Sequence, residues 1–457
     1  MKVVKVHWKP QREIGMKNNN PRKIFDCREE QIDYTMDQKK ALLLVDTFMQ
    51  SKETFLLIAG NAGTGKTTIA ENIANFCSAD ILAPTNAAVK RLRDRMFGSG
   101  INKNRFSTIH QQLYGSPDPD TGEFVMAGNL KGAPAYLIDE SSMIDVDVLK
   151  DLMDEAKRAG VRIIFLGDDF QLEPVGKDPK LFGWQKSFPN DFNDNYKFKL
   201  TEVRRNEGAI LEVATHLRGC KSNKVEILNR DTQDFIITRI FTHELALDIR
   251  DDRSFVVLVS TNKTRIAYNK RIREAKFEED CVNVINDGEK VISVANNEYL
   301  NGEHYTIKNP KIIKSYDKTV NLGSKMYPNN KRLKFYLIEH EVRGHDKAFK
   351  TLLFPDLDVP SLHSGQLMNN REIFMDNNLV KYHKMLNRRM WRKNLNIATY
   401  GYATSTHKSQ GNEWDNVYID CDWLSDNWNK ARWMYTAITR AKKKVELKFS
   451  NQFKVID

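Results

Sequence analysis

The sequence GNAGTGKTT spans residues 60 to 68 and follows directly on the apolar run FLLIA. Gly60, Gly65, Lys66 and Thr67 match the pattern GxxxxGK[ST], and the residues after them have helical spacing. In such a loop, glycines let backbone N–H groups approach phosphate oxygens, and the helix N-terminus adds partial positive charge. The strand, loop and helix together predict a site for the phosphates of a nucleotide.

The residue types in this loop have expected chemical roles. The Lys66 ammonium is expected to reach the β- and γ-phosphates, and the Thr67 hydroxyl is expected to coordinate Mg²⁺. Kinases, GTPases and motors all carry such a loop, so the rest of the chain must choose between them. The nucleotide-binding residues that we expect here are Gly60, Ala62, Gly63, Thr64, Gly65, Lys66, Thr67 and Thr68.

Two carboxylates and an amide follow later apolar runs. Asp139 and Glu140 come at the carboxyl end of AYLI, and open α/β sheets bind ligands at that edge. We expect Asp139 to hold the magnesium and Glu140 to accept a proton from the attacking water. Gln171, in GDDFQL, is expected to touch the γ-phosphate or its water. A polar turn is the alternative for that motif taken alone.

Two arginines lie further along the chain, Arg205 in LTEVRRNE and Arg440 in YTAITRAKKK. An arginine near the γ-phosphate stabilises negative charge in the transition state. If a second core supplies it, hydrolysis depends on closure of the cleft between the cores. Taken singly, such arginines are more often surface ion-pair partners, and the residues alone leave that alternative open.

Two sets of buried strands predict two α/β cores, since helical segments alternate with near-continuous apolar runs. The first set is FLLIAG (55 to 60), DILAPT (80 to 85), AYLIDE (135 to 140) and VRIIFLGD (161 to 168). The second set is RSFVVLVST (253 to 261), NIATYGYA (396 to 403), DNVYID (415 to 420) and KKVELKFS (443 to 450).

Insertions of a different kind interrupt both cores. Residues 289 to 310 have short strands and a turn at Asn301-Gly302, as in a small β-barrel. The role of the basic cluster KMLNRRMWRKN, residues 384 to 394, is open. The expected units are a basic flexible arm (1–30), a first core (31–106 and 133–200) with an insertion (107–132), and a second core (201–270 and 396–457) with an insertion (271–395).

The bulk composition limits the partners and the compartment. The formal net charge is +11 and the sequence pI is about 9.1, which favours a polyanionic partner such as nucleic acid over a merely soluble basic surface. The five cysteines form no CxxC pair, so we expect reduced thiols and a cytoplasmic protein. We find no apolar run that would cross a bilayer, and we expect no membrane association.

The motifs appear in a set order: Asp37-Gln38, GNAGTGKTT, APTNAA (83 to 88), STIH (107 to 110), DESSM (139 to 143), GDDFQL, LTEVRRN, THKSQG (406 to 411) and YTAITRA. This series resembles a superfamily 1 helicase. DESSM, GDDFQL and THKSQG are similar to its RecD-like branch, called 1B. The resemblance covers roughly residues 34 to 450. It implies two RecA-like P-loop NTPase cores, with a β-hairpin called the pin (116–132) in the first and an SH3-like β-barrel in the second.

The resemblance also implies residue roles. Gln38 would contact the adenine, and Gln171 would sense the γ-phosphate. Arg205 and Arg440 would be arginine fingers, with Arg204 as the alternative to Arg205. Phe124 of the pin would stack on the first opened base pair, although a Phe packing its own hairpin remains open. The expected DNA contacts are Pro84, Thr85, Asn86, Thr108, His110, Phe124, Thr406, His407, Lys408, Ser409 and Gln410.

The implied function is ATP- and Mg²⁺-dependent movement 5′ to 3′ on single-stranded DNA, with unwinding of duplex in replication, recombination or repair. The expected partners are single-stranded DNA, duplex junctions and single-stranded-DNA-binding or other replication proteins. We expect a monomer, in the host cytoplasm if the chain is phage-encoded. The open alternatives are an RNA-directed or 3′-to-5′ motor of the same superfamily, and a DNA-stimulated ATPase that remodels protein–DNA complexes. A small-molecule kinase would leave STIH and THKSQG unexplained.

Overall fold

A computed structural model describes most of the chain, with gaps. The described residues are 34–96, 101–114, 126, 130, 132–172, 193–203, 208–220, 224–278, 280, 284–293, 302–321, 330–342, 348–355, 395–421, 423–425 and 429–457. Four expected features lie outside them: the basic arm, most of the pin with Phe124, Arg205 with its neighbour Arg204, and the cluster at 384–394.

The first core is a six-stranded parallel sheet in the order β3-β2-β4-β5-β1-β6. Its strands are β1 (Phe55–Gly60), β2 (Asp80–Ala83), β3 (Phe106–Thr108), β4 (Ala135–Ile138), β5 (Arg162–Gly167) and β6 (Lys197–Leu200). Its helices are α1 (Met36–Gln50), α2 (Lys66–Phe76), α3 (Asn86–Arg95), α4 (Ile109–Tyr114) and α5 (Val146–Ala159). Two apolar clusters form on it, one beneath α1, α2 and α3 and the other beneath α4 and α5.

Local chemistry explains where these elements begin and end. Thr35 and Gln38 form a capping box at the start of α1, and Thr85 caps α3 through its side-chain oxygen. Asp145 caps α5, which ends at Gly160 in the left-handed conformation. The four expected strands of this core are confirmed. The edge strands β3 and β6 were not expected, because an edge position does not require a continuous apolar run.

The second core is a five-stranded parallel sheet in the order β15-β9-β16-β17-β8. Its strands are β8 (Phe235–Thr238), β9 (Phe255–Val259), β15 (Ala403–Ser405), β16 (Trp414–Asp420) and β17 (Ala441–Lys448). Its helices are α7 (Ala209–Leu217), α8 (His243–Arg250), α9 (Asn262–Phe277), α13 (Thr406–Ser409) and α14 (Lys430–Ile438). A small parallel pair joins β7 (Glu226–Leu228) to β18 (Lys454–Ile456).

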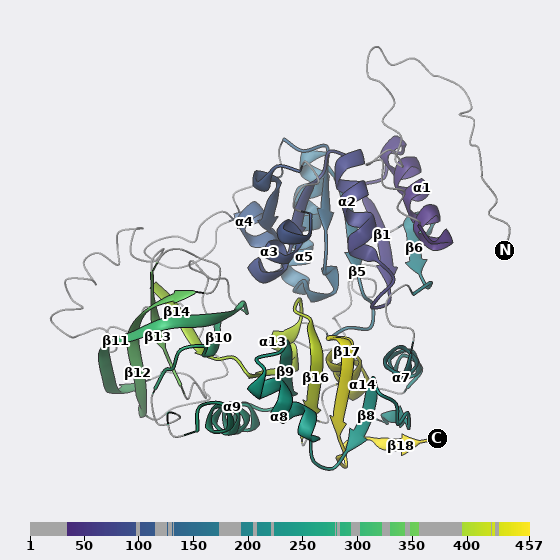
Figure 1. Cartoon of the computed structure of the whole chain (residues 1–457). Helices are drawn as coiled ribbons and strands as arrows, with labels where there is room; N and C mark the ends of the chain where they lie inside the picture. The colour runs from purple at the N-terminus through teal and green to yellow at the C-terminus, as the bar shows by residue number, and fades with distance from the viewer. Residues whose placement is uncertain are drawn as a thin grey trace.

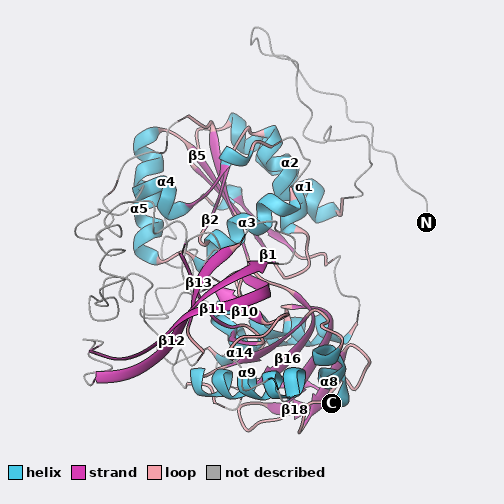
Figure 2. Ribbon diagram, turned by 60° about the vertical axis from the view of Figure 1, so that its left-hand side comes forward, coloured by secondary structure: helices cyan, strands magenta, loops and turns pink. Residues whose placement is uncertain are grey.

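The insertion in the second core contains a closed five-stranded barrel. Its strands are β10 (Lys290–Ser293), β11 (His304–Asn321), β12 (Asn330–Val342), β13 (Phe349–Leu353) and β14 (Leu395–Tyr400). β10 pairs with β11 as expected, and the Gly302 N–H donates to the Ser293 carbonyl at the end of that pair. β11 and β12 form a long antiparallel hairpin, which projects from the barrel in Figure 2. A small barrel is therefore confirmed, and its likeness to an SH3 domain stays a prediction.

Two expected boundaries of the second core are wrong. The run NIATYGYA was assigned to the core sheet, but β14 closes the barrel and only Ala403–Ser405 joins β9. A buried apolar run does not reveal which sheet it enters. The other boundary, at 270, falls inside α9. The Asn269 side chain of that helix accepts the N–H groups of Tyr402 and Ala403, each at 3.0 Å, so α9 belongs to the core.

Figure 1 shows the first core above the second, with the barrel beside the second core. Among the described residues, no helix has the length and apolar character needed to cross a bilayer. The same residues contain no group of three or more His, Cys, Asp or Glu side chains placed to hold a metal ion. Cys77, Cys220 and Cys421 form no disulfide.

Candidate nucleotide site between the two cores

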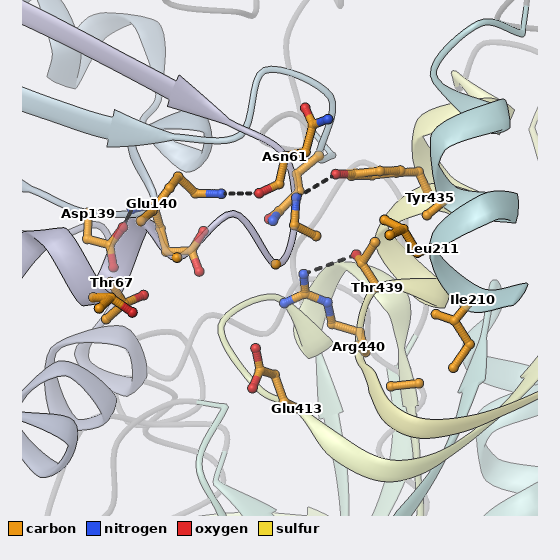
Figure 3. Close-up of a pocket in the computed structure, with 18 of the residues that line it drawn as sticks. Asn61, Thr67, Asp139, Glu140, Ile210, Leu211, Glu413, Tyr435, Thr439 and Arg440 are labelled. Carbon is orange, nitrogen blue, oxygen red and sulfur yellow. Dashed lines mark hydrogen bonds between the residues drawn. The ribbon is translucent and has the colours of Figure 1, made fainter. Parts of the chain in front are cut away.

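A cavity of about 300 Å³ opens where the two cores meet. Figure 3 shows Thr67, Asp139 and Glu140 of the first core on one side, and Tyr435, Thr439 and Arg440 of the second core on the other. The first core also contributes most of the phosphate loop, with Arg91, Arg95 and Gln171. The remaining lining residues of the second core are Ile210, Leu211, Ala214, Thr215, Arg218, Glu413 and Ala441.

The phosphate loop has the backbone that its sequence predicts. Gly63 and Gly65 take positive φ values of 80° and 77°, which few other residues adopt. Gly65 is the N-cap of α2, so the first N–H groups of that helix face the loop. The Lys66 ammonium donates to the Gly60 and Asn61 carbonyls at 2.8 and 2.9 Å. It is therefore held across the loop, where phosphate oxygens can replace those carbonyls.

Gln38 lies behind the loop rather than in the cavity. Its side chain is fully buried, and its amide donates to the Thr64 carbonyl at 2.9 Å. Its side-chain oxygen accepts from the Thr35 N–H at 3.1 Å. A Cβ placed on Gly65 would lie 2.3 Å from the Gln38 amide nitrogen. In the structure Gln38 therefore supports the phosphate loop. The contact of Gln38 with adenine stays a prediction.

The two carboxylates follow β4 as expected, and their charges interact. Burial and the neighbouring Glu140 raise the pKa of Asp139 to about 6. Burial also pushes the pKa of Glu140 upward, but Arg91 and Arg440 outweigh this effect and hold it below its usual value. Glu140 adopts a left-handed conformation with φ 53°, which is strained for a residue with a side chain. Its Oε2 atom has no hydrogen-bond partner among the described residues.

Gln171 and Asp168, which lies three residues before it, connect the two cores. The Gln171 side chain lines the cavity, and its Oε1 atom is buried without a hydrogen-bond partner in the described part of the chain. Its backbone carbonyl accepts from the Arg432 guanidinium at 3.1 Å. The Asp168 carboxylate accepts from Tyr435 at 2.7 Å and from Arg218 at 2.9 Å. The expected sensor therefore lies in a segment held by three second-core side chains.

Arg440 enters the cavity from the second core, as expected. It is almost fully buried, and its guanidinium donates to Thr436 and Asn412 carbonyls at 3.1 and 3.4 Å. A further N–H donates to the Thr439 hydroxyl at 3.3 Å. This arrangement orients the arginine through groups of the second core, and places it in the same cavity as Lys66 and Glu140.

Tyr435 is a site residue that sequence reasoning missed. Its hydroxyl accepts the Ala62 N–H of the phosphate loop at 2.9 Å and donates to Asp168. The ring packs edge-on against Phe170, with centroids 5.2 Å apart. Arg218 and Arg91 were missed as well. The sequence offered one signal for two of these residues, namely their place beside a motif. Tyr435 is the first residue of YTAITRA, and Arg91 follows APTNAA on the same helix.

The expected DNA-contact residues differ in exposure. His110 and Lys408 are exposed, while Pro84, Thr85, Asn86 and His407 are half-buried. Desolvation lowers the pKa of His407 to about 4, so its ring is neutral at pH 7. Thr108, Thr406, Ser409 and Gln410 are buried, and Gln410 donates to the Leu172 carbonyl at 2.9 Å. Side-chain contact of these four with DNA stays a prediction, and it requires the local packing to open.

Comparison with known proteins finds similarity to helicases. A model described as an AAA domain matches residues 33–236, and one described as a UvrD-like helicase C-terminal domain matches residues 400–447. The ATP-dependent DNA helicase dda of Enterobacteria phage T4 is 30% identical over 273 residues, which is 54% of this chain and 58% of that protein. The RecBCD enzyme subunit RecD of Buchnera aphidicola is 21% identical over 86% of this chain and 70% of that protein.

A solved structure of Pif1 helicase from Bacteroides, in complex with ADP-AlF3 and ssDNA, covers 93% of this chain and 95% of its own, at 17% identity and a TM-score of 0.47.

The fold and the site define a P-loop NTPase whose nucleotide cavity lies between two α/β cores. Within that class, the chain is similar to the superfamily 1B helicases, Dda and RecD among them. The match to Dda spans less than two thirds of that protein's length. The activity of this chain is accordingly a proposal.

Proposed function

We propose that this chain is an ATP-dependent DNA helicase, which moves 5′ to 3′ on single-stranded DNA and unwinds duplex ahead of it. One observation carries the proposal: the loop and carboxylates of the first core share a cavity with Arg440 and Tyr435 of the second. Hydrolysis in such a cavity responds to the relative position of the cores, which is what a motor requires. Similarity to the 1B branch supports the direction and the choice of DNA.

The residues present fit Mg²⁺ and the triphosphate of ATP. The Thr67 hydroxyl and the Asp139 carboxylate are oxygen donors of the kind that Mg²⁺ prefers, and both line the cavity. Bound Mg²⁺ would neutralise charge on the β- and γ-phosphates. The N–H groups at the start of α2 and the Lys66 ammonium supply the donors for phosphate oxygens.

The remaining cavity residues act on the attacking water and on the charge that develops. The Glu140 carboxylate accepts the proton of the water, and Gln171 orients that water or senses the γ-phosphate. The Arg440 guanidinium stabilises the transition state from the opposite core, with Arg205 as the second arginine finger. The part of Arg440 requires the two cores to be in contact.

The DNA would lie across both cores, along residues 83–88 and 107–110 of the first and 406–411 of the second. Hydroxyl, amide and imidazole groups bond phosphates without reading bases, which suits movement over any sequence. The pin would split the duplex, and the protein would act as a monomer on tailed junctions together with single-stranded-DNA-binding proteins. We propose that this helicase activity serves DNA replication, recombination or repair.

Strand displacement tests this function. Two partial duplexes, one with a 5′ single-stranded tail and one with a 3′ tail, are incubated with protein, ATP and Mg²⁺, and a Lys66→Ala variant serves as the blank. Unwinding from the 5′ tail alone is expected. Unwinding from the 3′ tail alone would retain the motor and overturn the direction. ATP hydrolysis that single strands stimulate, without displacement from either tail, would favour a remodelling ATPase.

A further inference from the structure

One arginine of α3 connects its own helix with two other segments that the proposed function treats separately. The Arg91 guanidinium donates to Glu140 Oε1 at 2.7 Å. Another of its nitrogens donates to the carbonyl of Gly411, the last residue of THKSQG in the second core. Arg91 itself lies on the helix that begins at Asn86, within the expected DNA segment of the first core. A single side chain thus joins the expected base to both expected DNA segments.

The contact with Glu140 determines how that carboxylate is held. Glu140 is 7% exposed, and Arg91 is the partner that its Oε1 atom meets, while Oε2 has none among the described residues. Arg91 lines the nucleotide cavity beside the carboxylate. An oxygen that accepts a short, charge-assisted bond from a guanidinium is a poorer acceptor for the proton of a water molecule. In this arrangement Oε1 of the expected base is occupied by the guanidinium, and Oε2 is buried.

The second contact makes the arrangement sensitive to movement. Glu140 belongs to the first core and Gly411 to the second, so a shift of one core against the other changes the distance that the guanidinium must span. The planar fork of an arginine has fixed directions for its donors, and it does not follow both acceptors through such a shift. A shift of the N-terminus of α3 also moves the Arg91 side chain, because Arg91 lies on that helix.

We propose that Arg91 is a positioning residue that keeps Glu140 from the attacking water until single-stranded DNA engages residues 83–88 and 406–411. This inference rests on the proposed function. DNA bound across both cores moves α3 and Gly411 relative to Glu140, and the guanidinium leaves Oε1. The carboxylate then takes the water. Stimulation of ATP hydrolysis by DNA follows from release of a contact rather than from a new group entering the site.

The test compares ATP hydrolysis with and without single-stranded DNA in wild type, Arg91→Ala and Arg91→Lys. In Arg91→Ala we expect kcat without DNA to rise about tenfold, a fraction of what a general base contributes, and the ratio of stimulated to basal kcat to fall toward one. KM for ATP should change little. Arg91→Lys keeps the charge but not the fork, so its basal kcat should rise less. If Arg91→Ala does not fold, the Arg91→Lys variant tests the inference by the same two quantities, the basal kcat and the ratio of stimulated to basal kcat.

Lys90→Ala is the matched control. Lys90 is the neighbour of Arg91 on α3, and it pairs with Glu303 next to the barrel without touching Glu140. Its removal loosens the same helix and should leave the stimulation ratio at the wild-type value. Equal loss of stimulation in both variants would reduce Arg91 to a tether between domains and overturn the inference.

A binding measurement gives a readout independent of turnover. If Arg91 couples the two sites, single-stranded DNA changes the affinity for a non-hydrolysable ATP analogue, and the analogue changes DNA affinity by the same factor. In Arg91→Ala that factor should approach one, measured by fluorescence anisotropy of labelled DNA. A wild-type coupling factor together with unchanged basal kcat would refute the inference, as would loss of basal kcat. If wild type itself shows no stimulation by DNA, the proposed function fails first.

Discussion

The two cores have the same kind of sheet but different turns after the corresponding strand. In the first, β1 leads through five residues to α2, and two glycines in that loop have positive φ. In the second, β9 leads through Ser260 and Thr261 to α9, and the Thr261 side chain caps that helix. A two-residue capped turn leaves no row of backbone N–H groups for a phosphate. We therefore expect the first core to hold the nucleotide, and the second to reach it with side chains.

This difference explains why the site is incomplete in either core alone. The loop and carboxylates belong to the first sheet, whereas Tyr435, Thr439 and Arg440 come from α14 and the turn that follows it. We expect the backbone groups to bind phosphate in any position of the cores, and the side chains of the second core to act only when the cores touch. Binding should consequently depend mainly on one core, and turnover on both.

Removing Lys66 should have the largest effect. Lys66→Ala deletes the ammonium that the loop carbonyls hold at 2.8 and 2.9 Å, and we expect the rate of ATP hydrolysis to fall by about 10³-fold or more. A steady-state ATPase assay at saturating DNA measures it. Lys448→Ala is the control, since Lys448 pairs with Asp420 in the second core, away from the cavity. Retention of a tenth of the wild-type rate in Lys66→Ala would contradict the role of the loop.

Changing Arg440 should separate turnover from binding. Arg440→Lys keeps the charge but not the geometry, and we expect kcat to fall about 10²- to 10³-fold, toward the range that an arginine finger contributes. Affinity for a labelled ATP analogue should fall far less, because the first core holds the phosphates. Both are measured on the same preparation, with thermal melting as a check on the fold. An equal loss of affinity and kcat would place Arg440 in ground-state binding.

The first core was predictable from sequence because its signals are local. The run FLLIAG, the loop after it and the carboxylates of DESSM each place their own residues, and the structure keeps them together. The second core was less predictable. Its strand β14 has the same apolar character as the core strands, yet it closes the barrel, because Gly401 lets the chain pass beside β10. A Cβ on Gly401 would lie 2.8 Å from the Val291 carbonyl carbon.

The contacts between cores were the least predictable. Tyr435 and Ala62 lie 373 positions apart, and Arg91 and Gly411 lie 320 apart. No spacing rule within one segment connects them. Gln38 and Gln410 were assigned to ligands on motif likeness, but each amide contacts a carbonyl of the protein. A motif indicates that a polar group is needed at a position. Only the three-dimensional structure shows which group that side chain contacts.

Removing one hydroxyl at the boundary between the cores should have the smallest and most specific effect. Tyr435→Phe keeps the ring against Phe170 but leaves the Ala62 N–H and one Asp168 oxygen without the partner that joins the cores. Loss of such a partner costs about 1–3 kcal/mol. We expect kcat with DNA to fall several-fold, and melting of the free protein to be lowered by a few degrees.

Tyr418→Phe makes the same chemical change within one core. The Tyr418 hydroxyl donates to Asp248 at 2.7 Å, the same distance as from Tyr435 to Asp168, and both tyrosines are 1% exposed. Asp248 belongs to α8 of the second core, so that bond does not cross between the cores. A similar lowering of the melting temperature is expected in both variants, but the fall in kcat only in Tyr435→Phe. Equal kcat in the two variants would mean that the hydroxyl stabilises the fold without transmitting contact between the cores to the phosphate loop.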